Sequence, residues 1–274
     1  EPEYLEKRLD GILEWKNLTI QKVYGAEAVT KESLLSWLRE FGEPLKPYIC
    51  DTSLYLDKAA KEGKKILFEA QLGALRDIDF GIYPFTSSSS TIGAYAPVGA
   101  GIPNHKLDLS IGVMKAYSTC VGEGPFTCEM FGEEAEELRK AGGEYGAATG
   151  RPRRVGPFDV PASRYGVRMQ GADEVALTKM DVLSSLKEIP VCVAYDVDGD
   201  LTADFPTGAK LDRAKPVVEK LPGWNCDISG CRKWEDLPKE AQDYVLFLEE
   251  KVGCPIRCIS VGAERDAYLL HEQN

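Results

Sequence analysis

Two short runs of consecutive apolar residues constrain the fold of this chain most strongly. They are Glu174–Thr178 and Pro190–Tyr195, and neither alternates apolar with polar residues as a half-exposed strand would. Such runs are typical of strands that are covered on both faces in a parallel or mixed sheet. Because helical patterns lie between the strand-like segments, the sequence predicts an α/β protein.

The other expected elements are spread over the whole chain. Apolar residues at helical spacing predict helices over Tyr4–Leu18, from Lys31 with Thr30 as N-cap, over Ser53–Lys61 capped by Asp51 or Thr52, over Glu133–Lys140, and over Lys239–Lys251. Further strands are predicted at Lys65–Glu69 and Pro255–Ser260, and a hairpin turn at Asp198-Gly199. No repeat or linker divides the chain, so we expect one domain over residues 1–274, with a helical segment at 1–63 and an α/β portion at 64–274.

The charge balance excludes several kinds of partner. The chain has 33 Lys+Arg against 44 Asp+Glu, a net charge of −11. Nucleic acids and anionic membranes both need a basic face, so neither is an expected partner. No run approaches about 18 apolar residues, so no transmembrane helix is predicted. Eight cysteines in a chain of this length favour reduced, mostly buried thiols over a disulfide scaffold or zinc site, and thus a cytoplasmic protein.

Lys179-Met180-Asp181 comes directly after the apolar run at 174–178. One carboxylate can accept both the N1–H and the exocyclic amine of guanine, while the lysine stem lies over the ring face. Ligands of α/β proteins bind at the carboxyl ends of strands, so the motif suits guanine recognition. A solvated strand end, with Asp181 as a helix cap, is the alternative.

Three arginines within four residues, Arg151, Arg153 and Arg154, stand out in an acidic chain. Guanidinium groups bind carboxylates and phosphates through paired hydrogen bonds, and the preceding Gly150 lets backbone N–H groups approach an anion. An anion-binding loop and a solvated basic turn both fit this segment.

Two further segments have polar groups that suit a ligand. The hydroxyl run at residues 83–91 fits either a packed loop that offers donors to a phosphate or a flexible linker. Gln71 follows a predicted strand and fits either an amide at a ligand edge or a plain turn. The sequence contains no G-x-x-x-x-G-K-[ST], G-x-S-x-G, H-E-x-x-H or C-x-x-C motif, and only two histidines, so a Cys–His or Ser–His site is not indicated.

Taken together and in order, these segments resemble the adenylosuccinate synthetases, the GTP-dependent ligases of the AMP branch of purine synthesis. The motifs that carry the resemblance are Ile66–Glu69, Asp77–Phe85, Lys115–Ser118, Val121–Phe126, Thr149–Arg151, Leu177–Leu183, Cys192–Tyr195, Leu221–Trp224 and Ser260–Gly262. The resemblance extends from near the first residue to Arg265. It implies a three-layer α/β fold similar to that of the P-loop NTPases, in which helices flank a mainly parallel or mixed central sheet.

The resemblance also implies which residues contact each ligand. For GTP they are Arg153, Lys179, Met180, Asp181, Ser260, Val261 and Gly262. For aspartate they are Ala147, Ala148, Thr149, Gly150, Arg151 and Arg153. For IMP they are Gln71, Leu72, Ser87, Val121 and Arg151.

The reaction of the family has two steps. O6 of IMP attacks the γ-phosphate of GTP to give 6-phosphoryl-IMP, and L-aspartate then displaces phosphate to give adenylosuccinate. The resemblance implies Mg²⁺ as cofactor, GTP as co-substrate and a homodimer as the complete enzyme. Three positions depart from the usual pattern: Gln71 lies one position early, Ser87 replaces a common Thr, and Ala148 replaces a second Thr.

The Gly-rich phosphate loop of the family, with its catalytic Asp and His and its Mg²⁺ contacts, is not found in these 274 residues. We therefore expect the C-terminal larger part of a synthetase, incomplete at its N-terminus. It would hold no metal ligand and no catalytic residue, apart from possible support by Gln71, and would have little or no ligase activity alone. The alternatives are a non-catalytic nucleotide-binding module, one half of a split synthetase, and a fragment too incomplete to fold stably because its sheet edge would be exposed.

Overall fold

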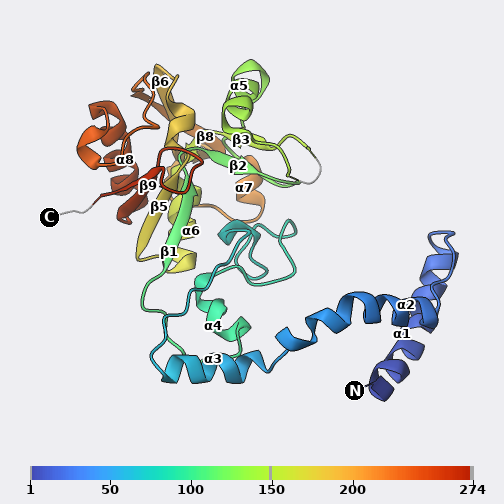
Figure 1. Cartoon of the computed structure of the whole chain (residues 1–274). Helices are drawn as coiled ribbons and strands as arrows, with labels where there is room; N and C mark the ends of the chain where they lie inside the picture. Colours follow the sequence, from blue (N-terminus) through green and yellow to red (C-terminus); the bar gives the residue numbers. More distant parts are fainter. Residues whose placement is uncertain (1, 148–149, 272–274) are drawn as a thin grey trace. The chain divides into compact units, whose positions relative to one another are not determined.

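A computed structural model describes residues 2–147 and 150–271 of the chain (Figure 1). Internal contacts divide the chain into two compact units, Glu1–Glu62 and Gly63–Asn274.

The regular elements described in the first unit are all helical. It contains α1 (Pro2–Lys22), α2 (Lys31–Trp37), a π-helical turn (Leu38–Gly42), a 3-10 segment (Glu43–Tyr48) and α3 (Thr52–Lys61). The side chains of Thr30 and Asp51 accept the backbone N–H groups of Ser33 and Leu54, which satisfies donors that a helix start leaves free. All three predicted helices of this unit are confirmed.

The second unit contains the sheet that carries the candidate site. Its four strands are β1 (Ile111–Lys115), β5 (Glu174–Thr178), β9 (Ile256–Ser260) and β10 (Tyr268–Leu270), in the order β1-β5-β9-β10. The β1–β5 and β5–β9 pairs are parallel and β9–β10 is antiparallel. The carboxyl ends of three parallel strands therefore lie side by side at one edge of the sheet.

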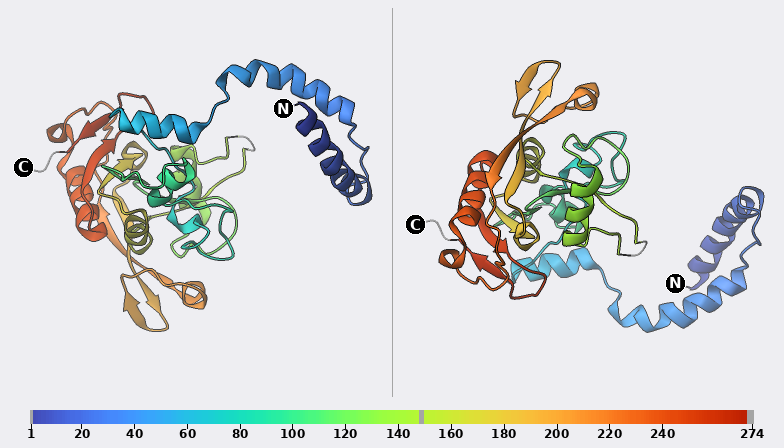
Figure 2. Two further views of the ribbon diagram at one scale, coloured as in Figure 1. Left: turned by 90° about the horizontal axis from the view of Figure 1, so that it is seen from below. Right: turned by 90° about the horizontal axis from the view of Figure 1, so that it is seen from above.

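The other strands form two smaller sheets. One sheet contains β4 (Phe158–Asp159), β6 (Glu188–Val197), β7 (Asp200–Thr202) and β8 (Lys215–Pro222), and the other pairs β2 (Ser118–Cys120) with β3 (Arg154–Gly156). Asp198 and Gly199 both have positive φ, 58° and 96°, as a tight hairpin turn requires, so the predicted turn is confirmed. In both views of Figure 2 this hairpin extends away from the rest of its unit.

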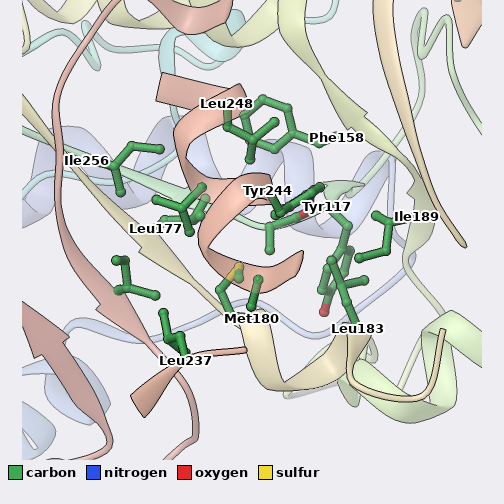
Figure 3. Packing of buried hydrophobic residues seen from close by; sticks show 14 of the residues in the cluster. Tyr117, Phe158, Leu177, Met180, Leu183, Ile189, Leu237, Tyr244, Leu248 and Ile256 are labelled. Atoms are coloured by element: carbon green, nitrogen blue, oxygen red, sulfur yellow. Dashed lines mark hydrogen bonds between the residues drawn. The ribbon is translucent and has the colours of Figure 1, made fainter. Parts of the chain in front are cut away.

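The second unit also contains helices, most of which pack against the strands. They are α4 (Ala96–Gly99), α5 (Gly132–Gly142), α6 (Val160–Gln170), α7 (Ala209–Arg213) and α8 (Lys239–Val252), with 3-10 turns at Ala74–Arg76, Gly93–Tyr95, Met180–Leu183 and Trp234–Asp236. The main cluster of buried side chains gathers round Tyr244 of α8, together with Leu177 and Leu248 (Figure 3). The hydroxyl of Tyr244 donates to the carbonyl of Ala116 at 2.6 Å, which ties α8 to the turn after β1.

The α/β class with mixed sheets and flanking helices is confirmed, although the strands are distributed over three sheets. The strand expected at Lys65–Glu69 is wrong: the segment has no regular structure and Leu67 is 90% exposed. An apolar run becomes a strand only where a neighbour completes its hydrogen bonds, and none does so among the described residues.

All eight cysteines are free thiols, as expected, but only Cys128, Cys192 and Cys254 are buried. In the described residues, no helix is both long and apolar enough to cross a bilayer.

Candidate functional site

A buried carboxylate lies where several of the motif segments meet. The side chain of Glu144 is fully buried and accepts four sets of hydrogen bonds. The donors are the Tyr117 hydroxyl at 2.6 Å, Lys115 Nζ at 2.9 and 3.0 Å, Lys179 Nζ at 3.0 Å and Arg153 Nη1 at 2.9 Å. The structure thus brings together Arg153 and Lys179, two predicted ligand residues from separate motifs. We call these five side chains the Glu144 cluster.

Electrostatics fix the charge of Glu144. Burial alone would raise the pKa of its carboxyl, but hydrogen bonds from Tyr117, Lys115 and Lys179 outweigh burial and lower the pKa to about 2. Burial lowers the pKa of Lys115, against the opposing effect of Glu144. Burial, with the hydrogen bond to Glu144 and the charges of Glu144 and Asp181, raises the pKa of the Tyr117 phenol. The cluster therefore holds one carboxylate against three cationic side chains, which leaves an excess of positive charge for an anionic ligand.

The Glu144 cluster forms because two segments turn sharply at this point, after α5 and after β5. Helix α5 ends at Gly143, whose left-handed backbone (φ 60°) redirects the chain so that Glu144 points inward. A Cβ on the preceding Gly142 would collide with the Tyr117 hydroxyl, so this position needs glycine. Lys179 is also left-handed (φ 63°), and its Nζ donates to the carbonyl of Gly142 at 2.5 Å.

The guanine motif lies at the carboxyl ends of the parallel strands. Lys179 follows β5, Lys115 ends β1 and Ser260 ends β9. Met180 is fully buried in the core, so only its backbone can face a ligand, while Asp181 is partly exposed. Asp181 lies inside the 3-10 turn that begins after Lys179, so the alternative of Asp181 as a helix cap is wrong.

Ser260, Val261 and Gly262 form a tight turn beside the guanine motif. The Ser260 hydroxyl donates to the carbonyl of Gly262 at 3.0 Å, and the Val261 N–H donates to Ala267 at 2.9 Å. Val261 is fully buried, which leaves backbone groups and the Ser260 hydroxyl as possible ligand contacts. Because β9 pairs in parallel with β5, this turn and Lys179 lie at the same sheet edge.

The arginine segment is a loop whose two ends are joined by backbone hydrogen bonds. The backbone N–H of Arg153 donates to the carbonyl of Glu144 at 2.9 Å. The N–H of Gly146 donates to the carbonyl of Arg151 at 2.8 Å, and the N–H of Gly150 donates to the carbonyl of Gly146 at 2.8 Å. Ala147 lies in this loop, whereas the predicted aspartate contacts Ala148 and Thr149 lie outside the described residues. The loop thus carries Arg151 close to the residues through which it is joined to the Glu144 cluster.

The three arginines have different environments. Arg151 is exposed, Arg153 is bound to Glu144, and Arg154 is held by Glu129 at 2.9 Å and by the carbonyl of Gly124 at 2.8 Å. A solvated basic turn does not describe Arg153 and Arg154, because both are partly buried and paired. Arg154 is occupied by structural contacts, which agrees with its absence from the predicted ligand residues.

Asp77 makes the hydroxyl segment a packed loop, not a flexible linker. Its buried carboxylate accepts the N–H groups of Asp79, Phe80 and Thr91 at 2.9, 3.0 and 2.6 Å, and the Ser90 hydroxyl at 3.0 Å. Burial would raise the pKa of Asp77, but these hydrogen bonds outweigh it and lower the pKa. The carboxylate therefore stays ionised and closes the loop.

Arg76 joins the two segments that carry the predicted IMP contacts Ser87 and Val121. Its guanidinium donates to the carbonyls of Phe85 at 2.6 Å, Val121 at 3.1 Å and Glu123 at 3.2 Å, while the Ser87 N–H donates to the Arg76 carbonyl at 2.8 Å. Sequence reasoning missed this role, as it missed Glu144, although Lys115 and Tyr117 belong to a motif that was recognised.

The remaining predicted IMP contacts, Gln71 and Leu72, are exposed. Leu72 has a positive φ of 79° and is followed by Gly73 at 81°, so the backbone reverses here. The turn alternative for Gln71 fits this geometry, and its contact with IMP stays a prediction.

A hollow of about 430 Å³ lies elsewhere in the second unit. It is lined by Phe85, Gly124, Pro125, Phe126, Thr127, Leu211, Asp212 and Ala214. None of the predicted ligand residues is among them, so we assign no substrate to it.

The fit of a metal ion can be judged from the donor set. Within 2–147 and 150–271, no three or more His, Cys, Asp and Glu side chains gather closely enough to hold a metal.

The chain is similar to known proteins of one family. A family model described as adenylosuccinate synthetase matches residues 1–269. Adenylosuccinate synthetase from Bifidobacterium adolescentis is 47% identical over 268 residues, which make up 97% of this chain and 63% of that protein. The enzyme from Heliobacterium modesticaldum is 45% identical over 270 residues, with 98% and 63% covered.

A solved structure is similar over the same range. Fully ligated adenylosuccinate synthetase from Plasmodium falciparum matches with a TM-score of 0.90 at 34% identity, covering 98% of this chain and 64% of that one. The chain spans about 63% of the length of the curated relatives it matches. On the family model, these identities and the shared fold, the chain belongs to the adenylosuccinate synthetase family.

Proposed function

We propose that this chain supplies the guanine- and aspartate-binding portion of an enzyme that joins IMP and L-aspartate, at the expense of GTP, to form adenylosuccinate through 6-phosphoryl-IMP. One observation carries the proposal: the Glu144 carboxylate binds both Lys179 of the guanine motif and Arg153 of the arginine loop, at 3.0 and 2.9 Å. Two predicted ligand segments that are distant in sequence thereby share one anchor. Family membership supports the identity of the substrates.

In this proposal Asp181 accepts the N1–H and the exocyclic amine of guanine, and the Lys179 stem lies over the base. The turn at Ser260–Gly262 offers backbone groups from the neighbouring strand. Each charge-assisted hydrogen bond of this kind contributes about 1.5–3 kcal/mol. Asp181 is partly exposed, which leaves it accessible to the base.

The arginine loop would bind L-aspartate through Arg151 and Arg153, with backbone groups of Ala147 and Gly150 and with Ala148 and Thr149. Arg153 would also reach GTP, because it shares Glu144 with Lys179. IMP would contact Arg151, together with Gln71, Leu72, Ser87 and Val121. The Arg76 hydrogen bonds support this last assignment for Ser87 and Val121, since they hold the two segments together.

Further parts of the proposal rest on the family. Mg²⁺ would offset charge on the transferring phosphoryl group. The complete enzyme would be a homodimer that works in the cytoplasm, which agrees with eight free cysteines.

The test is the substitution Asp181→Asn. An amide presents one acceptor and two donors where guanine needs two acceptors, so GTP affinity should fall by about 10- to 150-fold. Isothermal titration of the chain with GTP and, separately, with IMP measures both affinities. The control is Asp200→Asn, which removes an exposed carboxylate from the β6–β7 hairpin.

IMP affinity should be unchanged in Asp181→Asn, and both affinities should be unchanged in Asp200→Asn. Equal GTP affinity in Asp181→Asn and the unsubstituted chain would refute the guanine assignment.

A further inference from the structure

Glu144 has no role in the proposed ligand contacts, yet four polar side chains of the site donate to it. It is fully buried, and its donors come from four segments: the end of β1, the turn after it, the residue after β5, and the arginine loop. A buried carboxylate with this many ionic donors costs desolvation energy that a hydrophobic side chain would not. Its position between two ligand segments suggests a function beyond stability.

The two cationic side chains that are proposed to bind ligands, Arg153 and Lys179, are both held by Glu144 but not enclosed by it. The side chains of Arg153 and Lys179 remain 30% and 35% exposed, whereas Glu144 is 0% exposed. The carboxylate therefore sets where each cation lies while leaving part of it accessible to a ligand. A shift of Glu144 would move the lysine over the guanine site and the arginine of the aspartate loop together.

The backbone strengthens this link on the side of the arginine loop. Arg153 N–H donates to the Glu144 carbonyl at 2.9 Å, and the Arg153 carbonyl accepts Arg139 Nε at 2.9 Å. On the other side, Lys179 Nζ also binds the carbonyl of Gly142, two residues before Glu144. Ordering either ligand segment therefore orders the 142–144 segment, and with it the other ligand segment.

We infer that Glu144 is a positioning residue that couples the guanine site to the aspartate loop, so that each ligand increases the affinity for the other. This inference rests on the proposed function, because it assumes guanine at Lys179 and a carboxylate ligand at Arg153. Coupling between two binding sites is reciprocal. L-aspartate should therefore tighten the binding of a guanine nucleotide by the factor by which that nucleotide tightens L-aspartate.

The experiment measures this factor in the chain as it stands. GDP carries the guanine but no transferable γ-phosphate, so its dissociation constant can be titrated with and without saturating L-aspartate. The ratio of the two constants should be at least about 5 in the unsubstituted chain and close to 1 in Glu144→Gln. Glu144→Asp keeps the charge on a shorter side chain and should restore part of the ratio.

Two variants separate positioning from stability. Tyr117→Phe removes a hydrogen bond to Glu144 but keeps the carboxylate between Arg153 and Lys179. It should lower the unfolding temperature yet retain the ratio. Glu137→Gln removes an exposed charge from α5, the helix just before Glu144, and should leave both quantities unchanged.

The outcomes distinguish the two hypotheses. If GDP and L-aspartate both bind the unsubstituted chain with a ratio of 1, the two sites are not coupled. If Glu144→Gln keeps the full ratio, the coupling does not depend on Glu144. Either result refutes the inference and leaves the proposed function standing. If Tyr117→Phe loses the ratio as completely as Glu144→Gln does, Glu144 acts only through stability and the inference fails. If GDP does not bind at all, the proposed function fails, and the coupling fails with it.

Discussion

Among 44 acidic residues, Glu144 is distinguished by its surroundings and not by its local sequence. Lys179 and Arg153 were predicted as ligand residues because their motifs place cationic groups beside a strand end and a glycine. Glu144 belongs to neither pattern, and its partners lie 29 and 35 residues away in Lys115 and Lys179. Such contacts depend on the packed chain, so local sequence could predict the cations of the site but not the anion that orients them.

The charge of Glu144 gives a prediction about pH. Its pKa is about 2 in the folded chain against an ordinary value of 4.5, so its stabilising effect is complete above pH 4.5 and is lost as the pH falls toward 2. The lowered pKa limits the contribution of the Glu144 charge to the free energy of unfolding to about 3 kcal/mol. Solvent screening at the partly exposed lysines and Arg153 reduces this contribution to about 1–2 kcal/mol.

Urea unfolding of the unsubstituted chain and of Glu144→Gln measures this effect at several pH values. The difference in unfolding free energy should be largest near pH 7 and shrink between pH 4.5 and 2. Asp77, whose pKa is also lowered, is present in both proteins, so its contribution to the pH dependence cancels in the difference. A difference that does not change with pH would show that Glu144 does not stabilise through its charge.

At the scale of elements, local sequence patterns predicted strands and helices correctly where the folded chain provides the neighbouring elements that they need. The buried strands β5, β6 and β9, the helices α5 and α8 and the hairpin turn were all predicted. Helix α6 was missed because Pro161 and Gly166 suggest a loop, although Asp159 caps the helix and proline is tolerated in its first turn. The strand predicted at 65–69 failed for the opposite reason: its composition was suitable, but no described neighbour pairs with it.

The loops around Arg76 allow a prediction at the same scale. Arg76→Ala removes the donor that joins the carbonyls of Phe85, Val121 and Glu123. Amide hydrogen exchange should accelerate by about tenfold or more in residues 83–91 and 120–124 and stay unchanged in β5 and β9, because local opening becomes less costly.

Arg164→Ala is the matched control, since Arg164 is exposed on α6. Mass spectrometry of peptides from both variants gives the comparison. Uniform acceleration over the whole second unit in Arg76→Ala would mean that Arg76 supports the fold in general and does not join these two loops.

At the scale of the whole molecule, charge is distributed unevenly. The chain carries a net charge of −11, yet Lys115, Arg153 and Lys179 converge on one carboxylate at the carboxyl ends of parallel strands. An acidic surface disfavours polyanions, while the local excess of cations suits a small anionic ligand. The fold, through the parallel order of β1, β5 and β9, creates this concentration of charge from residues that are far apart in sequence.

The central claim, that Lys179–Asp181 recognises guanine, is tested most directly by comparing GTP with inosine triphosphate, which lacks only the exocyclic amine. A site built to accept that amine leaves its acceptor unpaired when the amine is missing. Titration of the unsubstituted chain should give an affinity for GTP at least about tenfold higher than for inosine triphosphate, and Asp181→Asn should abolish the difference. Equal affinities of the unsubstituted chain for the two nucleotides would contradict the claim.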